Sequence, residues 1–334
     1  MDMKKTLYFL FSAAGMLVLI LDGQTALAGA AEGLELCIKA VIPSLFPFLF
    51  LSSILIGALW GTNSRFLSRA GMLLGIPKGA ESILIAGFLG GYPSGAGAVG
   101  QAYREGGMDK ASAEHLLTFC SNAGPAFLFG ITAAQFSHQK MLWVLWAIHI
   151  LSAVTVGLFN NQQSTSAACL SSLSVSPAKA LNTAVRTTGI LCGWILCFRI
   201  LLKFLDRWFL WMLPEAVRIL IWGFLELSNG CCSLAFVQSE ALRFLICSVM
   251  LAFGGICVAM QTASVTEGIS LRPYLFGKTA QTLVALVMSL LYLRFGIAGV
   301  LVPPILPILL GPVKKGVAFR RIPVYNAGIM NRRS

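Results

Sequence analysis

Gly87-Phe-Leu-Gly-Gly-Tyr-Pro-Ser-Gly-Ala-Gly97 and Gly223-Phe-Leu-Glu-Leu-Ser-Asn-Gly230 are two short segments that interrupt apolar stretches at corresponding places in the two halves of the chain. In a bilayer every backbone N–H and C=O group must be hydrogen-bonded within the protein. Non-helical backbone therefore persists at membrane depth only where it is packed in protein or lines a wet cavity. An interrupted segment in each half is the pattern expected of a transporter whose ligand site lies at the interface of two repeats.

The composition is that of a polytopic membrane protein. The chain has 334 residues, of which 57% are hydrophobic and 11% charged, whereas a soluble globular protein has roughly 25% charged residues. Eight apolar segments are predicted to cross about 30 Å of hydrocarbon, and two shorter, interrupted ones are predicted to form hairpins. The predicted spans are 6–22, 37–60, 115–134, 141–159, 180–203, 241–262, 279–294 and 296–312, and the predicted hairpins are 82–104 and 214–240.

The formal net charge of +12 does not indicate a nucleic-acid-binding protein, because the basic residues are scattered between the predicted spans and concentrated in the C-terminal tail. This distribution is typical of positively charged cytoplasmic loops and of a tail that contacts anionic lipid headgroups. We therefore expect membrane lipids, and no nucleic acid, as partners. The basic residues of the tail are Lys314, Lys315, Arg320, Arg321, Arg332 and Arg333.

Signatures of metal and catalytic sites are missing from the sequence. The nine cysteines lie mostly inside apolar segments without a Cys-x-x-Cys pair or a zinc spacing, so we expect them to be packing residues. Gly95-Ala-Gly-Ala-Val-Gly100 matches a dinucleotide-binding fingerprint, but a membrane span follows it where a βαβ unit is needed. An intramembrane enzyme is the alternative class, yet no His-Glu-x-x-His motif is present and no histidine is placed by sequence to activate Ser94. We expect no enzyme activity, no metal and no cofactor.

The distribution of charge predicts two inverted units. Residues 1–28 are either a retained first helix or a cleavable signal-like segment, and in both cases the segment from Leu36 enters from outside. A re-entrant hairpin at 82–104 keeps the following basic residues and the tail inside. Three full crossings per unit then invert the second copy. The predicted parts are 1–35 (first helix and acidic outer loop), 36–160 (first repeat), 161–179 (polar linker), 180–294 (second repeat) and 295–334 (last span and basic tail).

Five motifs follow one another along the chain: Val41-Ile-Pro-Ser-Leu-Phe-Pro-Phe48, Gly91-Tyr-Pro-Ser-Gly-Ala96, Phe119-Cys-Ser-Asn-Ala-Gly-Pro125, Gly223-Phe-Leu-Glu-Leu-Ser-Asn-Gly230, and Phe253-Gly-Gly255 with Gln261. Together they resemble the nucleoside-recognition, or Gate, domain group, and within it a family of bacterial sporulation integral membrane proteins. The resemblance covers most of residues 36–294. It implies a multi-pass cell-membrane protein of the sporulating mother cell, required for the spore cortex, with a fold similar to concentrative nucleoside transporters, but it supplies no substrate. Relatives tend to carry a basic residue where this chain has Gly97.

Candidate site residues are the polar side chains at the four predicted breaks. Glu226 leads them, since a carboxylate at membrane depth costs a few kcal/mol and is a functional hypothesis by default. It is predicted either to bind solute or a coupling Na⁺ or H⁺, or to cap a hairpin helix, and Arg186 or Arg199 is a candidate ion-pair partner. His149 is either a proton relay or a helix-packing residue. The predicted substrate-binding set is Glu226, Ser228, Asn229, Ser121, Asn122, Tyr92, Ser94 and Gln261.

The sequence therefore predicts an all-α polytopic membrane protein that moves a small polar solute, nucleoside-like by fold, through alternating access. A membrane scaffold or receptor that keeps the same fold is the alternative. The sequence leaves open whether the protein forms a homo-oligomer.

Overall fold

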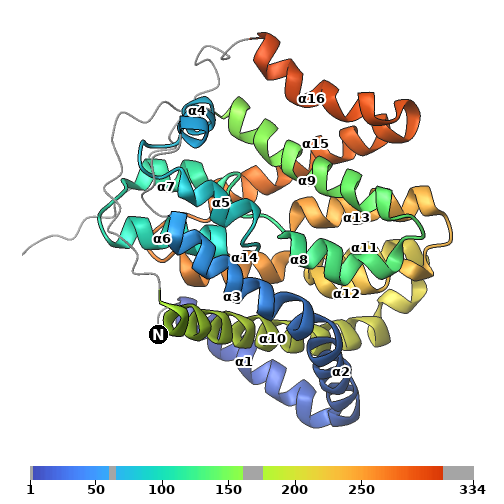
Figure 1. The fold of residues 1–334 in the computed structure, drawn as a ribbon. Coiled ribbons are helices and arrows are strands. Elements are labelled where there is room, and N and C mark those ends of the chain that lie inside the picture. The colour runs from blue at the N-terminus through green and yellow to red at the C-terminus, as the bar shows by residue number, and fades with distance from the viewer. Residues whose placement is uncertain (1–2, 60–64, 161–175, 311–334) are drawn as a thin grey trace, which may run out of the picture.

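The structure is a computed structural model that describes residues 3–59, 65–160 and 176–310. All regular elements within these residues are helical, which confirms the predicted all-α class (Figure 1). Five helical segments are long and apolar enough to cross a membrane: Gly23–Leu59, Gln139–Phe159, Pro177–Trp208, Glu240–Val265 and Arg272–Phe295.

The first half of the chain contains the first predicted hairpin and the first predicted break. Helices α5 and α6 form the hairpin, and the chain between α7 and α8 forms the break. The elements are α1 (Met3–Leu21), α2 (Gly23–Leu36), the π-helical turn η1 (Cys37–Val41), α3 (Ile42–Leu59), α4 (Arg65–Leu73), α5 (Ser82–Phe88), α6 (Ser94–Arg104), α7 (Lys110–Leu117), α8 (Pro125–Phe127), η2 (Leu128–Thr132), η3 (Ala133–Gln135) and α9 (Gln139–Phe159).

The second half repeats this order. Helices α11 and α12 form the second hairpin, and the break lies between α13 and α14. The elements are α10 (Pro177–Trp208), η4 (Leu210–Met212), α11 (Glu215–Leu225), α12 (Leu227–Cys232), η5 (Leu234–Phe236), α13 (Glu240–Phe253), α14 (Ile256–Val265), α15 (Arg272–Phe295) and α16 (Ile297–Leu310). The predicted linker and basic tail lie largely outside the described residues.

The long helices form two groups, with the hairpins between them. Helix α10 packs along α2 and α3, whereas α15 packs against α9, α13 and α16. The α5–α6 hairpin and the α11–α12 hairpin lie at opposite sides of the middle of the molecule (Figure 1). This arrangement brings the two breaks and the two hairpin turns to the centre.

Glycines allow each hairpin to close tightly. A Cβ added at Gly95 would lie 1.9 Å from the carbonyl oxygen of Cys120 and 2.7 Å from the Cα of Gly87. A Cβ added at Gly230 would lie 2.3 Å from the Cα of Gly223. Only residues without a side chain fit here, which is why the same Gly-Phe-Leu pattern begins both turns.

The helices break at both places that the sequence predicts. In the first half, α7 ends at Leu117 and helical structure resumes only at Pro125, whose ring is tolerated at the first position of a helix. In the second half, Gly254 and Gly255 have φ angles of +84° and +91°, which favour glycine. The predicted span 115–134 is thus a chain of short helical pieces rather than one long helix.

The N-terminal region differs from the prediction. Residues 23–36, expected in an outer loop, form α2 and continue into α3. A Cβ at Gly29 would lie 2.9 Å from the Cα of Ile200, so the small face of α2 packs directly on α10. Glu32 of α2 accepts hydrogen bonds from Arg199 (2.7 Å) and Lys203 of α10. Because of these contacts, the segment predicted to be an acidic loop is a packed helix.

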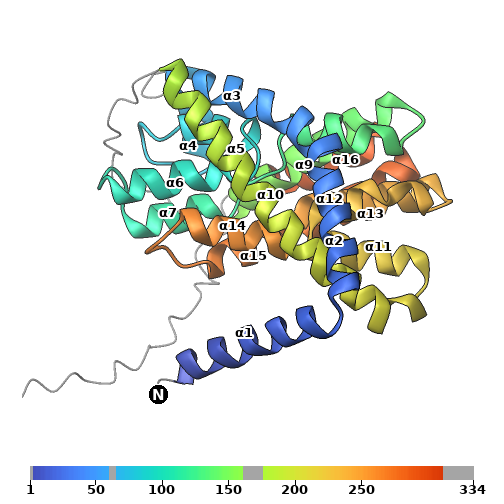
Figure 2. The same ribbon diagram turned by 90° about the horizontal axis from the view of Figure 1, so that it is seen from below.

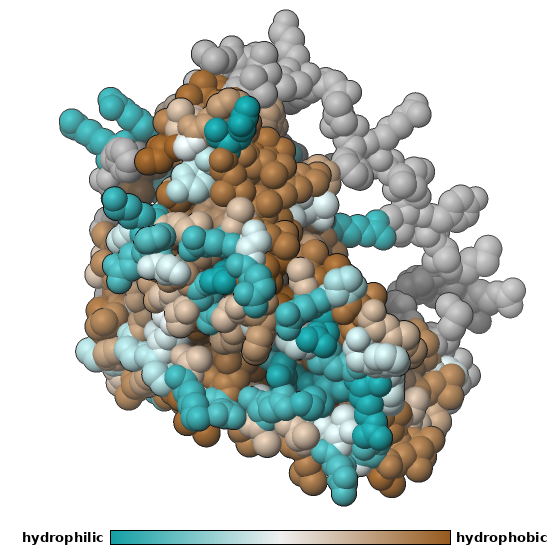
Figure 3. All heavy atoms as spheres, turned by 90° about the vertical axis from the view of Figure 1, so that its right-hand side faces the viewer, coloured by the Kyte–Doolittle hydropathy of each residue, from teal (hydrophilic) through white to brown (hydrophobic). Residues whose placement is uncertain are grey.

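Surface chemistry fits a protein embedded in a bilayer. Helix α1 extends away from the rest of the molecule (Figure 2) and exposes large apolar side chains, among them Leu7 and Phe11. The face in Figure 3 carries a band of hydrophilic side chains bordered by hydrophobic surface. Polar groups bordering apolar surface are what a membrane protein presents where it meets water.

Candidate functional site

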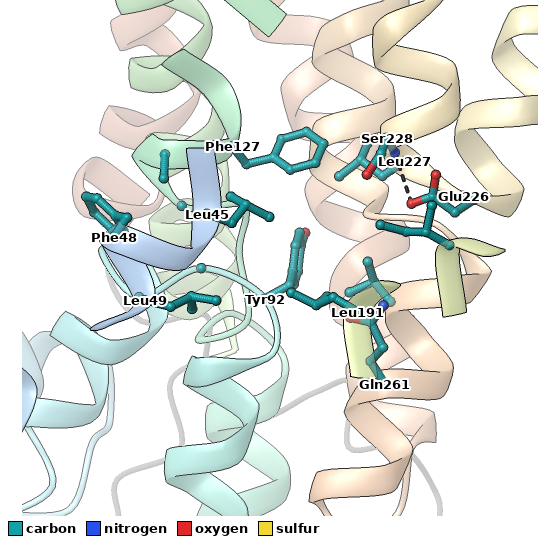
Figure 4. Close-up of a pocket in the computed structure, with 16 residues that line it drawn as sticks. Leu45, Phe48, Leu49, Tyr92, Phe127, Leu191, Glu226, Leu227, Ser228 and Gln261 are labelled. Atoms are coloured by element: carbon teal, nitrogen blue, oxygen red, sulfur yellow. Dashed lines mark hydrogen bonds between the residues drawn. The ribbon is translucent and has the colours of Figure 1, made fainter. Parts of the chain in front are cut away.

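A small pocket lies where the two hairpins, α3, α8, α10 and α14 meet. Its volume of about 40 Å³ is room for roughly three water molecules. Figure 4 shows Tyr92 of the first hairpin on one side and Glu226, bonded to Ser228, on the other. The lining residues are Leu45, Phe48, Leu49, Gly90, Gly91, Tyr92, Gly124, Ala126, Phe127, Leu191, Ile195, Glu226, Leu227, Ser228, Val258 and Gln261.

Glu226 is both a helix cap and a pocket-lining residue. It has extended backbone between α11 and α12, and its side chain is 3% exposed. The carboxylate accepts hydrogen bonds from the backbone N–H groups of Ser228 (3.0 Å) and Asn229 (2.8 Å) and from the Asn229 side-chain amide (2.8 Å). Three donors offset part of the cost of burying this group, so the second tip holds the Glu226 side chain with donors from its own turn.

The predicted ion pair between Glu226 and an arginine of α10 is wrong. Arg199 donates to Glu32, at 2.7 Å, and Arg186 is exposed. The reason is that residues 23–36 form α2 and bring their own carboxylate to α10. Within the described residues, the hydrogen-bond donors to the Glu226 carboxylate are neutral groups.

Two other predicted residues, Ser228 and Gln261, line the pocket with Glu226. Gln261 is 2% exposed, and its amide nitrogen donates to the sulfur of Cys257 at 3.3 Å. Its side-chain oxygen, Oε1, has no hydrogen-bond partner among the described residues. Gln261 therefore offers an unused acceptor at the pocket, whereas Asn229 is directed to the Glu226 carboxylate and does not line the pocket.

Tyr92 and Asn122 belong to a second polar cluster, which reaches the pocket through Tyr92. The Nζ of Lys278, on α15, donates to the Tyr92 hydroxyl (3.0 Å), the Asn122 Oδ1 (3.3 Å) and the Gln281 Oε1 (2.9 Å). Tyr92 also donates to the carbonyl of Leu251, next to the second break, at 3.3 Å. Lys278 lies 5.1 Å from the centre of the Tyr92 ring. This cluster joins the first hairpin tip and the first break to α15.

Ser94 and Ser121, like Asn122 and Asn229, do not line the pocket. Ser94 begins α6 and donates to the Gly90 carbonyl at 3.2 Å, so its hydroxyl stabilises the hairpin turn. Ser121 is fully buried in the first break, and its hydroxyl has no partner among the described residues. Neither side chain lines the pocket.

His149 is part of the packing around the first break. Its Nε2 accepts a hydrogen bond from the backbone N–H of Ala123 at 3.0 Å, and a nitrogen that accepts carries no proton. The backbone carbonyl of His149 accepts from Gln281 at 3.1 Å. This geometry supports the helix-packing alternative for His149.

Lys278 and Gln281 join the second polar cluster although the sequence does not single them out. The predicted span begins at residue 279, which puts Lys278 at its edge, where lysines commonly extend to water. The structure begins α15 at Arg272, which places Lys278 in its second turn, 1% exposed. A Lys-x-x-Gln pair, three positions apart, on one helical face was the available signal.

Among the described residues, no group of three or more His, Cys, Asp or Glu side chains is arranged to hold a metal ion.

Comparison with known proteins gives one curated relative and no structural one. The chain is 32% identical over 160 residues to the sporulation integral membrane protein YlbJ of Bacillus subtilis (strain 168), a match that covers 45% of this chain and 37% of the relative. The chain therefore spans little more than a third of the length of the curated relative it matches. No family model matches the chain, and no solved structure matches it. This protein is thus an integral membrane protein that resembles a sporulation membrane protein.

Proposed function

We propose that this protein is a secondary transporter that moves a small polar solute by alternating access through the pocket between its two hairpins. The observation that carries the proposal is that Tyr92 and Glu226, one from each hairpin, line the same buried pocket. Polar groups at the tips of broken helical segments are the usual substrate ligands in transporters built from repeats. The proposed activity is translocation and involves no covalent step.

The two halves are proposed to be inverted repeats with re-entrant hairpins. Each half has one glycine-closed hairpin and one broken helix, in the same order. In each half, an arginine side chain donates a hydrogen bond to the last carbonyl of the helical segment that follows the break. Arg104 donates to the Val265 carbonyl (2.8 Å) and Arg243 to the Gln135 carbonyl (2.6 Å). Gln135 ends η3 and Val265 ends α14, so the helical segment after each break ends at a carbonyl that accepts from an arginine of the other half. These reciprocal contacts between the halves, together with the shared order of hairpin and break, support a duplicated unit.

The size of the pocket favours a mechanism with moving hairpins. A volume of about 40 Å³ holds a few water molecules, so a nucleoside-like solute needs one hairpin to withdraw. Gln261 supplies a free acceptor, and Glu226 offers an acceptor for a solute hydroxyl or amine. A coupling Na⁺ or H⁺ at Glu226 is part of the proposal, as is contact of the exposed apolar helices with lipid.

The biological setting is proposed from the resemblance to YlbJ. We place the protein in the cell membrane of the mother cell of a sporulating bacterium, with a role in formation of the spore cortex, and assign it to the Gate domain group. A non-transporting scaffold or receptor in sporulation is the second candidate. For a scaffold, the exposed Arg104 and the half-buried Arg243, which join the two halves, would matter, whereas the pocket would not.

Uptake into proteoliposomes tests the proposal. The purified protein is given radiolabelled nucleosides, nucleobases, amino sugars and small organic acids, with and without sodium and proton gradients. We expect saturable uptake of at least one solute, reduced at least tenfold by Glu226→Gln and unchanged by Glu215→Gln, a partly exposed glutamate of the same hairpin. The scaffold would be favoured if the folded protein took up no solute in proteoliposomes while deletion of its gene still impaired sporulation.

A further inference from the structure

Lys278 is the group in the structure that the proposed site leaves unexplained. Its side chain is 1% exposed, on a helix that is a candidate membrane span. Within the described part of the chain, its three hydrogen-bond partners are neutral oxygens. An ammonium buried without a counter-charge costs several kcal/mol, so an ionisable side chain in this position is rarely structural alone.

The orientation of two of its partners is fixed by the backbone. The Asn122 side-chain nitrogen donates to the Phe119 carbonyl (2.7 Å), so the Asn122 oxygen must face Lys278. The Gln281 nitrogen donates to the His149 carbonyl (3.1 Å), so the Gln281 oxygen faces Lys278 as well. Lys278 therefore meets two acceptors that cannot turn into donors.

The third partner can act in both directions. A tyrosine hydroxyl both donates and accepts. When Lys278 is an ammonium, it donates to Tyr92, and the Tyr92 hydroxyl donates to the Leu251 carbonyl at 3.3 Å. When Lys278 is a neutral amine, its two N–H groups go to the fixed amide oxygens and its lone pair accepts from Tyr92. The cluster thus satisfies Lys278 with and without the proton.

We propose that Lys278 is a proton-carrying site that controls the first hairpin, opening it when the proton is loaded and closing it when the proton leaves. The closed cluster offers the ammonium no negative partner, whereas an open, wet cluster solvates it. Loading the proton therefore favours withdrawal of the Tyr92 tip from the first break. The role in transport rests on the proposed function, but the movement itself does not.

Other groups near Lys278 must be separated from it in any test of pH dependence. The titratable groups facing Lys278 from the packed elements are Tyr92 of the first hairpin, Cys120 of the first break and His149 of α9. Tyr274 lies one turn earlier on α15. Ordinary cysteine and tyrosine lose their protons above about pH 8, whereas histidine titrates near neutrality. Substitution of Lys278 itself distinguishes its contribution from theirs.

Amide hydrogen exchange in lipid nanodiscs tests the proposal without a solute. The measured quantity is the protection of peptides covering 87–95 and 118–124, corrected for the pH dependence of intrinsic exchange. One proton linked to opening changes protection by at most about tenfold per pH unit. For the wild type we expect protection to rise about tenfold or more from pH 5.5 to pH 8.

Three variants make the result specific. In Lys278→Met, the two peptides should be protected at every pH, because methionine carries no charge that water must solvate. Lys278→Arg, permanently charged, should be poorly protected at every pH. Lys140→Met, at an exposed position at the start of α9, should keep the wild-type profile. If Lys278 had only a structural role, the two peptides would lose protection in both Lys278 variants.

Two results would overturn the inference: wild-type protection that does not change with pH, or a Lys278→Met variant with the wild-type pH profile. The comparison of wild type with Lys278→Met decides the matter if the arginine variant does not fold. Failure of the solute uptake assay alone would refute transport and leave the proton-controlled hairpin standing.

Discussion

The close approach of the first hairpin to the first break predicts that two glycines of the same helix respond oppositely to alanine. Gly95 and Gly97 lie two residues apart in α6. A Cβ at Gly95 would lie 1.9 Å from the Cys120 carbonyl oxygen, whereas a Cβ at Gly97 would have nothing within 4 Å. Any difference between the two variants therefore reports packing rather than helix propensity.

The expected magnitudes follow from these contacts. Both substitutions gain about 0.5–1 kcal/mol of helix propensity, since glycine is unfavourable inside a helix. At Gly95 the obstructing atoms belong to the backbone of Cys120 and Gly87, which cannot swing aside as a flexible side chain can. Overpacking of this kind costs about 1–3 kcal/mol or more. We expect Gly95→Ala to be destabilised by about 2 kcal/mol and Gly97→Ala to be slightly stabilised.

The measurement is reversible unfolding in mixed micelles of mild detergent and dodecyl sulfate, followed by tryptophan fluorescence, which compares the free energies of unfolding. Expression and size-exclusion profiles show that both variants start from folded protein. Equal free energies for the two variants would mean that α6 does not approach Cys120 as closely as the structure places it, and the reasoning about the hairpin would fail.

Three further outcomes are expected. Tyr92→Phe removes the hydroxyl that links Lys278 to the second break, so it should lower the free energy of unfolding by about 1–2 kcal/mol; an unchanged value in the same micelle assay would contradict this. Glu32→Gln weakens half-exposed ion pairs between α2 and α10 and should cost only about 0.5–1 kcal/mol; a loss above about 3 kcal/mol would show that the pairs are more buried than in the structure. Arg243→Met should speed amide exchange near Gln135 at least about threefold, because the carbonyl loses its charged donor; unchanged exchange there would mean that the arginine does not hold this helix end.

Much of the fold and part of the site could be predicted from local sequence. The breaks at Gly124-Pro125 and Gly254-Gly255 are predictable because proline and positive-φ glycine determine backbone geometry on their own. Glu226 could be singled out since a lone carboxylate in an apolar stretch is costly. The helix over 23–36 could not be predicted, because its acidic residues are typical of a loop and their partners, Arg199 and Lys203, lie far along the chain on α10.

The partner of the first hairpin tip could not be predicted, for a reason of distance along the chain. Lys278 is 186 positions from Tyr92, and nothing in the sequence around either residue refers to the other. Span prediction also places charged residues outside hydrocarbon, so a lysine at a predicted span edge is assigned to water. Only the packing of α15 against the first break reveals that it is buried.

The two hairpin tips are held in place by different groups, and this difference bears on the mechanism. The second tip carries its own acidic side chain, Glu226, and holds it with donors from its own turn. The first tip carries no charge and is held by Lys278 from the other half of the chain. A tip that holds itself together can move as a unit, whereas a tip held from outside is released when its partner changes state. The proton on Lys278 is therefore better placed to control the first hairpin, and Glu226 to hold what the pocket binds.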